Sequence, residues 1–114
     1  MMNQPLISSD RVEGTDVYNL AGDKLGKIDC VMIDKVSGHT RFAVLEFGGF
    51  LGIGTDLYPV PWSLLRYDTS LEGYVVPLTM EQLEAAPKYT KEALPEYTDS
   101  YGRTVTDHYG VAWM

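Results

Sequence analysis

Two apolar segments joined by a tight turn constrain most strongly what this chain can fold into. They span residues 24–35 and 40–47, and the Ser-Gly pair at 37–38 between them is typical of a turn. Successive side chains of a strand point to opposite faces of a sheet, so strict alternation would leave one polar face. Val31 and Ile33 break that alternation. The pattern therefore predicts a β-hairpin that is covered on both faces.

Shorter strand patterns on both sides of this hairpin predict a mainly β fold. Turn residues recur roughly every eight to twelve positions, as in small barrels and sandwiches. Pro59 and Pro61 lack the N–H that an inner strand needs, so their strand is expected to lie at a sheet edge or to carry a break. Gly26 indicates a bulge or a sharp bend. Six strands are predicted, at 16–20, 24–35, 40–47, 56–62, 65–68 and 74–78.

The pattern changes at Thr79, which divides the chain into a β core at 1–80 and a helical or irregular extension at 81–114. Thr79 and Gln82 match a capping box, in which each side chain bonds a free backbone amide of the first helical turn. This motif predicts a short helix at 79–86.

A weaker helix is predicted at 98–109. Tyr101, Val105 and Tyr109 would line one of its faces, whereas Gly102 lowers its intrinsic stability. Such a helix must dock on something to persist. Two roles remain open for this tyrosine-rich tail: packing on its own barrel, or reaching a partner or a second subunit.

The chain has the composition of a globular protein with an acidic surface. Its 114 residues carry a net charge of −7, which disfavours phosphate backbones and anionic membranes. No run approaches the roughly 20 apolar residues that span a bilayer, and no signal peptide is recognisable. We expect a cytoplasmic protein that contacts no nucleic acid directly and does not span a membrane.

No combination of residues predicts a catalytic, metal or cofactor site. Cys30 is the one cysteine and lies in an apolar run, where a buried, unreactive thiol is expected. His39 and His108 are far apart, and neither has an Asp or Cys at ligand spacing. The glycines at 48–54 lack the spacing of a nucleotide-binding loop, and no Gly-Lys-Ser/Thr is present. We expect no enzymatic activity, no metal and no cofactor.

The same glycine-rich segment carries three large apolar residues, Phe50, Leu51 and Ile53. The glycines permit a sharp corner, whereas the apolar side chains require burial. Two arrangements satisfy both needs: a plug across one end of a barrel, or an apolar surface that meets a partner.

Several short stretches, in the same order along residues 8–80, resemble PRC-barrel domains. These are Asp16-Val17-Tyr18-Asn19 with Ala21-Gly22, Leu25-Gly26-Lys27-Ile28, Lys35-Val36-Ser37-Gly38, Ala43-Val44-Leu45, and Tyr58-Pro59-Val60-Pro61-Trp62 with Leu64-Leu65. The resemblance implies a small, strongly bent, six-stranded PRC-type β-barrel with a short helix and an irregular C-terminal tail. Relatives include the cytoplasmic part of the photosynthetic reaction centre H subunit and the C-terminal domain of a ribosome maturation factor. Both use the barrel for protein contacts, not for catalysis.

We therefore predict a non-enzymatic protein-binding or assembly module that acts through its barrel surface and apolar corner as a homo-oligomer. The candidate interface residues are Phe50, Leu51, Ile53, Tyr58 and Trp62. Two alternatives remain: a small-ligand or hydrolytic pocket between barrel and tail, and an accessory factor that docks on a basic ribosomal protein.

Overall fold

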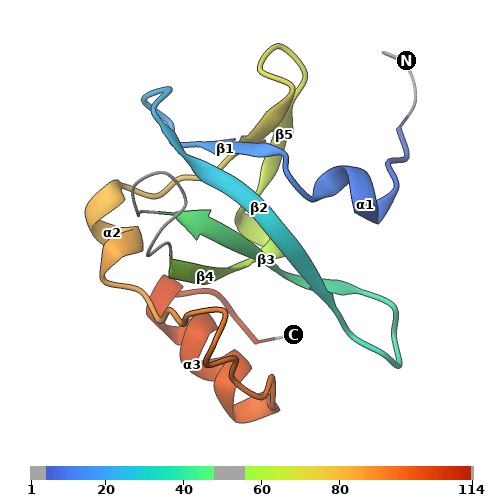
Figure 1. Ribbon diagram of the computed structural model, residues 1–114, viewed down its shortest axis with the longest axis vertical. Helices are drawn as coiled ribbons and strands as arrows, with labels where there is room; N and C mark the ends of the chain where they lie inside the picture. The colour runs from blue at the N-terminus through green and yellow to red at the C-terminus, as the bar shows by residue number, and fades with distance from the viewer. Residues whose placement is uncertain (1–4, 48–55, 114) are drawn as a thin grey trace.

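One curled six-stranded sheet, with short helical segments around it, makes up the computed structural model, which describes residues 5–47 and 56–113 (Figure 1). The described α-helices lie near the two ends of the chain, before the first strand and after the last. In order they are α1 (Ser9–Val12), β1 (Asp16–Tyr18), β2 (Lys24–Ile33), β3 (Thr40–Phe47), β4 (Asp56–Pro61), the 3-10 turn η1 (Trp62–Leu64), β5 (Arg66–Asp68), β6 (Gly73–Val75), α2 (Met80–Glu84) and α3 (Asp99–Tyr109).

The strand order of the sheet is β4-β3-β2-β1-β6-β5. Neighbouring strands are antiparallel except β1 and β6, which run parallel. The two outermost strands, β4 and β5, are consecutive in the chain and joined directly by η1. Among the residues that the structure describes, however, no backbone ladder pairs β4 with β5. The mainly β fold with six strands is thus confirmed, whereas a barrel closed by hydrogen bonds is not.

Gly26 allows β2 to pass very close to β3. A Cβ atom at this position would lie 2.0 Å from the carbonyl oxygen of Glu46, a distance at which atoms overlap. The pairing with β1 also shifts here, because Val17 opposes Gly26 whereas Tyr18 opposes Lys24. The bulge or bend predicted at Gly26 is therefore present.

The prolines of β4 lie on an edge strand, as predicted. Leu57, Pro59 and Pro61 alternate along β4, so their backbone nitrogens share one side of the strand. At Leu57 that side pairs with Tyr89 through N–H···O bonds of 2.8 and 3.0 Å. Pro59 and Pro61 have no N–H to offer there, which protects this edge from pairing with another chain.

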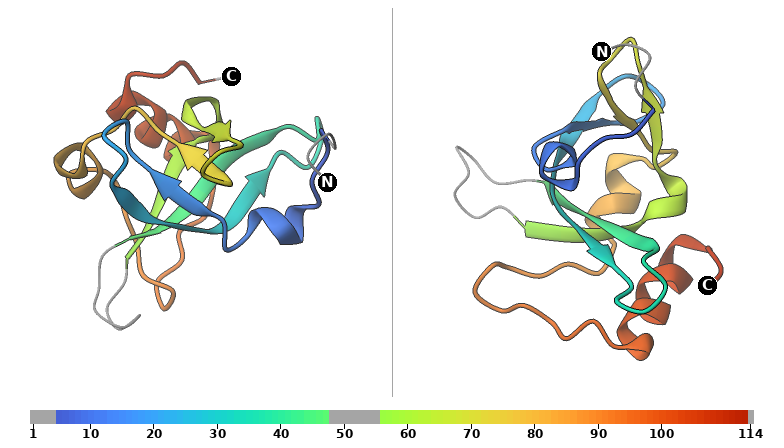
Figure 2. Two further views of the ribbon diagram at one scale, coloured as in Figure 1. Left: turned by 90° about the horizontal axis from the view of Figure 1, so that it is seen from above. Right: turned by 90° about the vertical axis from the view of Figure 1, so that its right-hand side faces the viewer.

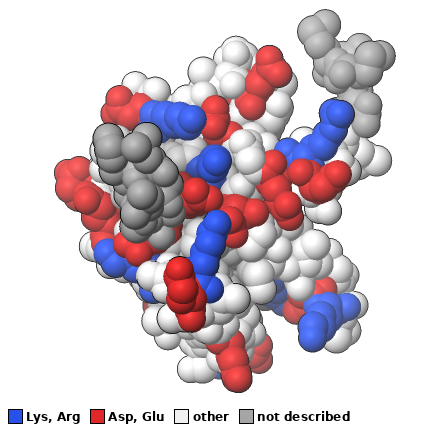
Figure 3. Space-filling model, viewed as in Figure 1, with Lys and Arg blue, Asp and Glu red and all other residues white. Residues whose placement is uncertain are grey.

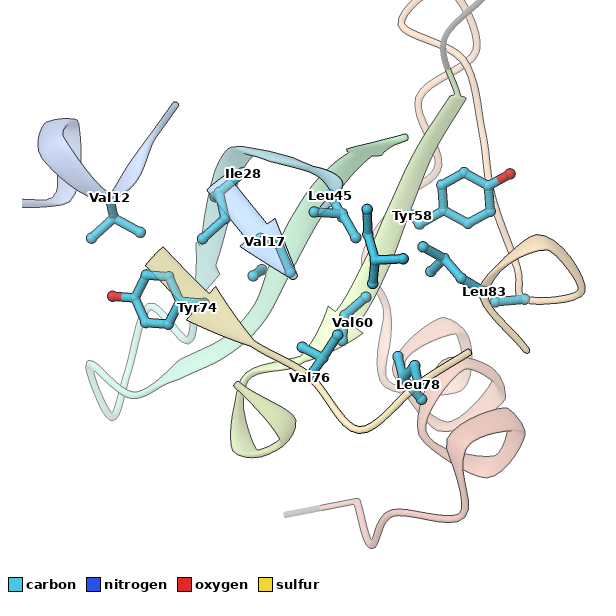
Figure 4. Packing of buried hydrophobic residues seen from close by; sticks show 13 residues of the cluster. Val12, Val17, Ile28, Leu45, Tyr58, Val60, Tyr74, Val76, Leu78 and Leu83 are labelled. Carbon is cyan, nitrogen blue, oxygen red and sulfur yellow. The ribbon is translucent and has the colours of Figure 1, made fainter. Parts of the chain in front are cut away.

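The main core lies on the concave face of the sheet (Figure 4). Fully buried side chains from several strands meet there, and Leu83 of α2 closes one side. The capping box of α2 is formed as predicted: the Gln82 amide donates to the Thr79 hydroxyl and the Thr79 amide to the Gln82 side chain. The core members are Val12, Val17, Leu25, Ile28, Ala43, Leu45, Tyr58, Val60, Tyr74, Val76, Leu78, Leu83 and Ala86.

Residues 87–113, here called the C-terminal segment, pack on the part of the sheet formed by β2, β3 and β4, on the side that faces away from β1 and β6. In Figure 2 the sheet formed by β2, β3 and β4 separates α3 from the β1–β6 region. Helix α3 contacts β4 and buries Val105 completely. Its Thr98 cap and left-handed Gly110 define its two ends, so the helix predicted at 98–109 is confirmed.

Candidate interaction surface

The predicted interface residues have different environments. Phe50, Leu51 and Ile53 lie outside the described residues. Tyr58 is 3% exposed and packs in the core, with its ring 5.5 Å from that of Phe47. Trp62 is partly buried, and its ring lies 5.5 Å from that of Tyr74. Of the two described residues, Trp62 therefore has side-chain surface to offer, whereas the Tyr58 side chain is almost fully enclosed.

Strand directions bring several connections together at one end of the sheet. β3 stops there at Phe47 and β4 starts at Asp56, and these two residues are paired. β1 ends, β2 begins and β6 ends at the same end of the sheet, because Tyr18 pairs with both Lys24 and Val75. We call this end of the sheet the 47/56 end. Residues 48–55 of the chain connect the two strands that meet there.

Two apolar side chains are exposed near the 47/56 end. Leu20, in the turn between β1 and β2, is 76% exposed. Met80, the first residue of α2, is 38% exposed. Figure 1 shows this turn and α2 on the same side of the molecule as the end of β3 and the start of β4. The sequence prediction missed both residues, because neither lies in an apolar run that would have marked it.

Charges of both signs lie around the strands. Figure 3 shows acidic side chains over much of the visible face, with basic side chains between them. Lys24 pairs with Asp16 at 3.1 Å, and Lys88 approaches Asp56 at 3.9 Å. On this face, basic side chains therefore lie among carboxylates, in a chain with a net charge of −7.

The convex side of the sheet, here called the outer face, is covered by the chain itself. Phe42 and Val44 alternate with core-facing residues of β3, and Pro59 is paired with Val44. Phe42 is 3% and Val44 0% exposed. The ring of Phe42 lies 6.1 Å from that of Tyr97 and 6.3 Å from that of Trp113. The apolar second face from which we predicted oligomerisation is thus buried under the C-terminal segment, and the tail packs on its own sheet.

Tyrosine hydroxyls inside this contact form a pair. The Tyr89 and Tyr97 oxygens are 2.6 Å apart, and the Tyr97 ring also packs edge-on against Tyr101 at 5.1 Å. Burial, and then the hydrogen bond from Tyr89, raise the pKa of Tyr97 well above its ordinary value of 10.0. Both hydroxyls are therefore protonated at neutral pH, where they act as structural contacts and not as a base.

The remaining chemically reactive side chains are dispersed. Burial and the carboxylate of Asp29 raise the pKa of the Cys30 thiol from 9.0 to about 11. His39 is exposed, whereas His108 places Nε2 3.3 Å from the carbonyl oxygen of Gln82. Within residues 5–47 and 56–113, no three His, Cys, Asp or Glu side chains gather into a metal-binding group.

Space for a small ligand is limited inside the core. An apolar void of about 10 Å³ lies between the strands, which is about the room that one water molecule occupies. It lies inside the core, whereas the ligand-pocket alternative places its site between barrel and tail. Its lining residues are Val17, Ile28, Ala43, Leu45, Val60, Leu65 and Val76.

The helices that the structure describes include none long and apolar enough to cross a membrane. In comparisons with known proteins, the PRC-barrel domain family model matches residues 5–83, which include the six described strands and α2 as far as Leu83. No curated protein matches the chain. The matched range ends before the C-terminal segment begins.

Proposed function

The chain belongs to the PRC-barrel domain family, and from this premise we propose that it is a non-enzymatic protein-interaction module that pairs with a second copy through its 47/56 end. The observation that carries the proposal is the exposure of Leu20 and Met80 near the 47/56 end, where the connection 48–55 leaves β3 and enters β4. Apolar side chains that gather on one part of a soluble protein's surface are typical of contact sites.

The sequence has further apolar residues in the connection that begins and ends at the 47/56 end. Phe50, Leu51 and Ile53 belong to the connection between the paired residues Phe47 and Asp56. A stable pair of chains needs about 1,200–2,000 Å² of buried surface in total, or 20–30 residues on each side. We propose that the turn holding Leu20, the connection 48–55 and the first turn of α2 all contribute to this area.

Light scattering on the purified chain tests the proposal. We expect twice the 12.7 kDa chain mass for the wild type, and the chain mass for the double variant Leu20→Asp/Met80→Asp. Val36→Asp is the matched control, because Val36 is 97% exposed in the turn after β2, at the opposite end of that strand. A wild-type protein that stays at 12.7 kDa at all concentrations would contradict the proposal, as would equal effects of the two substitutions.

A further inference from the structure

We infer that the outer face of β2, β3 and β4 is a binding site for the C-terminal segment that can accept this segment either from its own chain or from a second copy. The inference concerns a different face from the 47/56 end and does not require pairing there. It starts from the residues that the segment covers, since Phe42, Val44 and Pro59 are buried although they lie outside the main core.

The contacts between segment and face define what the face binds. Tyr89 adds one residue to the edge of β4 by exchanging both backbone hydrogen bonds with Leu57. Tyr97 and Trp113, far apart along the segment, pack on the same ring of Phe42. The site therefore takes an extended residue at the sheet edge and aromatic side chains over β3.

Charge complementarity further limits which partner the outer face can bind. Lys88 lies 3.9 Å from Asp56, and Lys91 lies 3.8 Å from Asp29. Two bare faces brought together would oppose these carboxylates to one another, so direct face-to-face pairing is disfavoured. A segment with two lysines followed by aromatic residues matches the face, and the same segment of a second copy matches it by identity.

The segment is separable from the sheet that it covers. The family match ends at residue 83, whereas Ala86 is anchored in the core and Tyr89 on β4. Pro87 and Lys88 alone connect these two anchors. A change of backbone direction at these two residues would redirect the whole segment, and the packing of Tyr109 against the core and the contact of His108 with Gln82 would then be made on the second copy. Re-forming the same contacts on a second copy is what exchange between chains requires.

The protein concentration decides whether the outer face holds the C-terminal segment of its own chain or that of a second copy. The contacts are the same in both arrangements, so the attached segment has the advantage of an effective concentration in the millimolar range. Micromolar protein should therefore keep its own segment in place. Exchange should become extensive as the chain concentration approaches about 1 mM, where the two arrangements compete on equal terms.

Mixed single-cysteine chains test the exchange directly. With Cys30→Ser as the background, one chain carries Leu57→Cys and the other Tyr89→Cys. Residues that exchange both hydrogen bonds across an antiparallel pair have Cα atoms about 5.5 Å apart, within disulfide range. After equilibration of equal amounts at about 1 mM and oxidation, we expect a covalent dimer of the two different chains in about a quarter of the material, since about half of the faces hold a second copy's segment and half of those copies are the other variant. The dimer is identified by mass on a non-reducing gel.

The matched control uses a pair inside the sheet. Lys27 and Glu46 oppose each other across β2 and β3, so a mixture of Lys27→Cys and Glu46→Cys chains should give no mixed dimer. A mixed dimer from both mixtures, or from neither, would overturn the inference. Should Leu57→Cys impair folding, Asp56→Cys and Thr90→Cys replace the first pair, because the antiparallel pairing of Leu57 with Tyr89 places these two neighbours opposite each other.

Repeating the mixture in the Leu20→Asp/Met80→Asp background separates this inference from the proposed function. A mixed dimer that persists there shows exchange without the 47/56 end. Loss of the mixed dimer only in this background would overturn the claim that the two faces act independently.

Discussion

Gly102 shows how a residue that weakens a helix can serve a tertiary contact. In the sequence it argues against α3, because glycine lowers helix stability by about 1 kcal/mol relative to alanine. In the structure a Cβ atom at Gly102 would lie 2.4 Å from the ring of Trp113. The absence of a side chain is what lets the end of the chain fold back over α3.

Gly102→Ala should therefore displace Trp113 even though it improves the helix. We expect a red shift of Trp113 fluorescence and a net loss of about 1–2 kcal/mol in stability, as for other overpacking substitutions. The measurement uses a Trp62→Phe background, since the chain has two tryptophans. The exposed helix residue Ser100, changed to Ala, is the control. An unshifted spectrum would mean that Trp113 does not pack on α3.

Cys30 provides a prediction about pH. Its pKa is raised by burial and then by Asp29 to about 11 from the ordinary 9.0. Folding therefore favours the neutral thiol, and the stability that this contributes is complete below pH 9 and is lost as the pH rises through 11. At pH 9 the thiolate fraction should fall from about one half in the unfolded chain to about 1% in the folded one.

Alkylation by iodoacetamide at pH 9 should accordingly be about 50-fold slower in the native protein than in guanidinium chloride. Tracking the rate with pH checks the cause. A native rate that levels off below pH 9 would show an accessible thiol with an ordinary pKa.

At the scale of the elements, α2 depends on its first turn. The helix has five residues, too few to be stable by itself, and the capping box bonds two otherwise free amides. Thr79→Ala should cost about 1 kcal/mol, measured as a lower urea midpoint with an unchanged slope. Thr69→Ala, in the exposed turn after β5, is the control and should leave the midpoint in place. Equal midpoints for both variants would show that packing of Leu83 alone fixes α2.

The elements also show what could be predicted from the sequence. Local chemistry was sufficient for the strands, whose six predicted ranges match the observed boundaries to within three residues, and for the edge position of Pro59 and Pro61. The short helix α1 was not predicted, because Ser9–Val12 is polar and has a single buried residue.

Which chain covers each apolar face could not be predicted from local sequence. The apolar residues of β3 indicated two buried faces correctly, but an apolar residue carries no information on whether its own chain or another covers it. Tyr58 was predicted to support the interface behind Phe50, Leu51 and Ile53, yet register places it opposite Leu45 on the core face. Leu20 and Met80 are isolated apolar residues in sequence, and only strand direction brings them to one edge.

At the scale of the whole molecule, the two faces of the sheet have different roles. The concave face holds the main core, whereas the outer face holds a segment of the same chain beyond the family match. The family core thus keeps its fold while the C-terminal segment removes an apolar face from the surface. The surface that we propose for a partner is the 47/56 end.

A dilution series followed by two-dimensional amide NMR tests this account most directly, because it locates the contact between copies residue by residue. We predict concentration-dependent shifts at Leu20, Met80 and their neighbours. Val105 and the rest of α3 should not shift, since the segment makes the same contacts in its own or a second chain. Spectra that do not change with dilution, or changes confined to α3 and the outer face, would contradict the account.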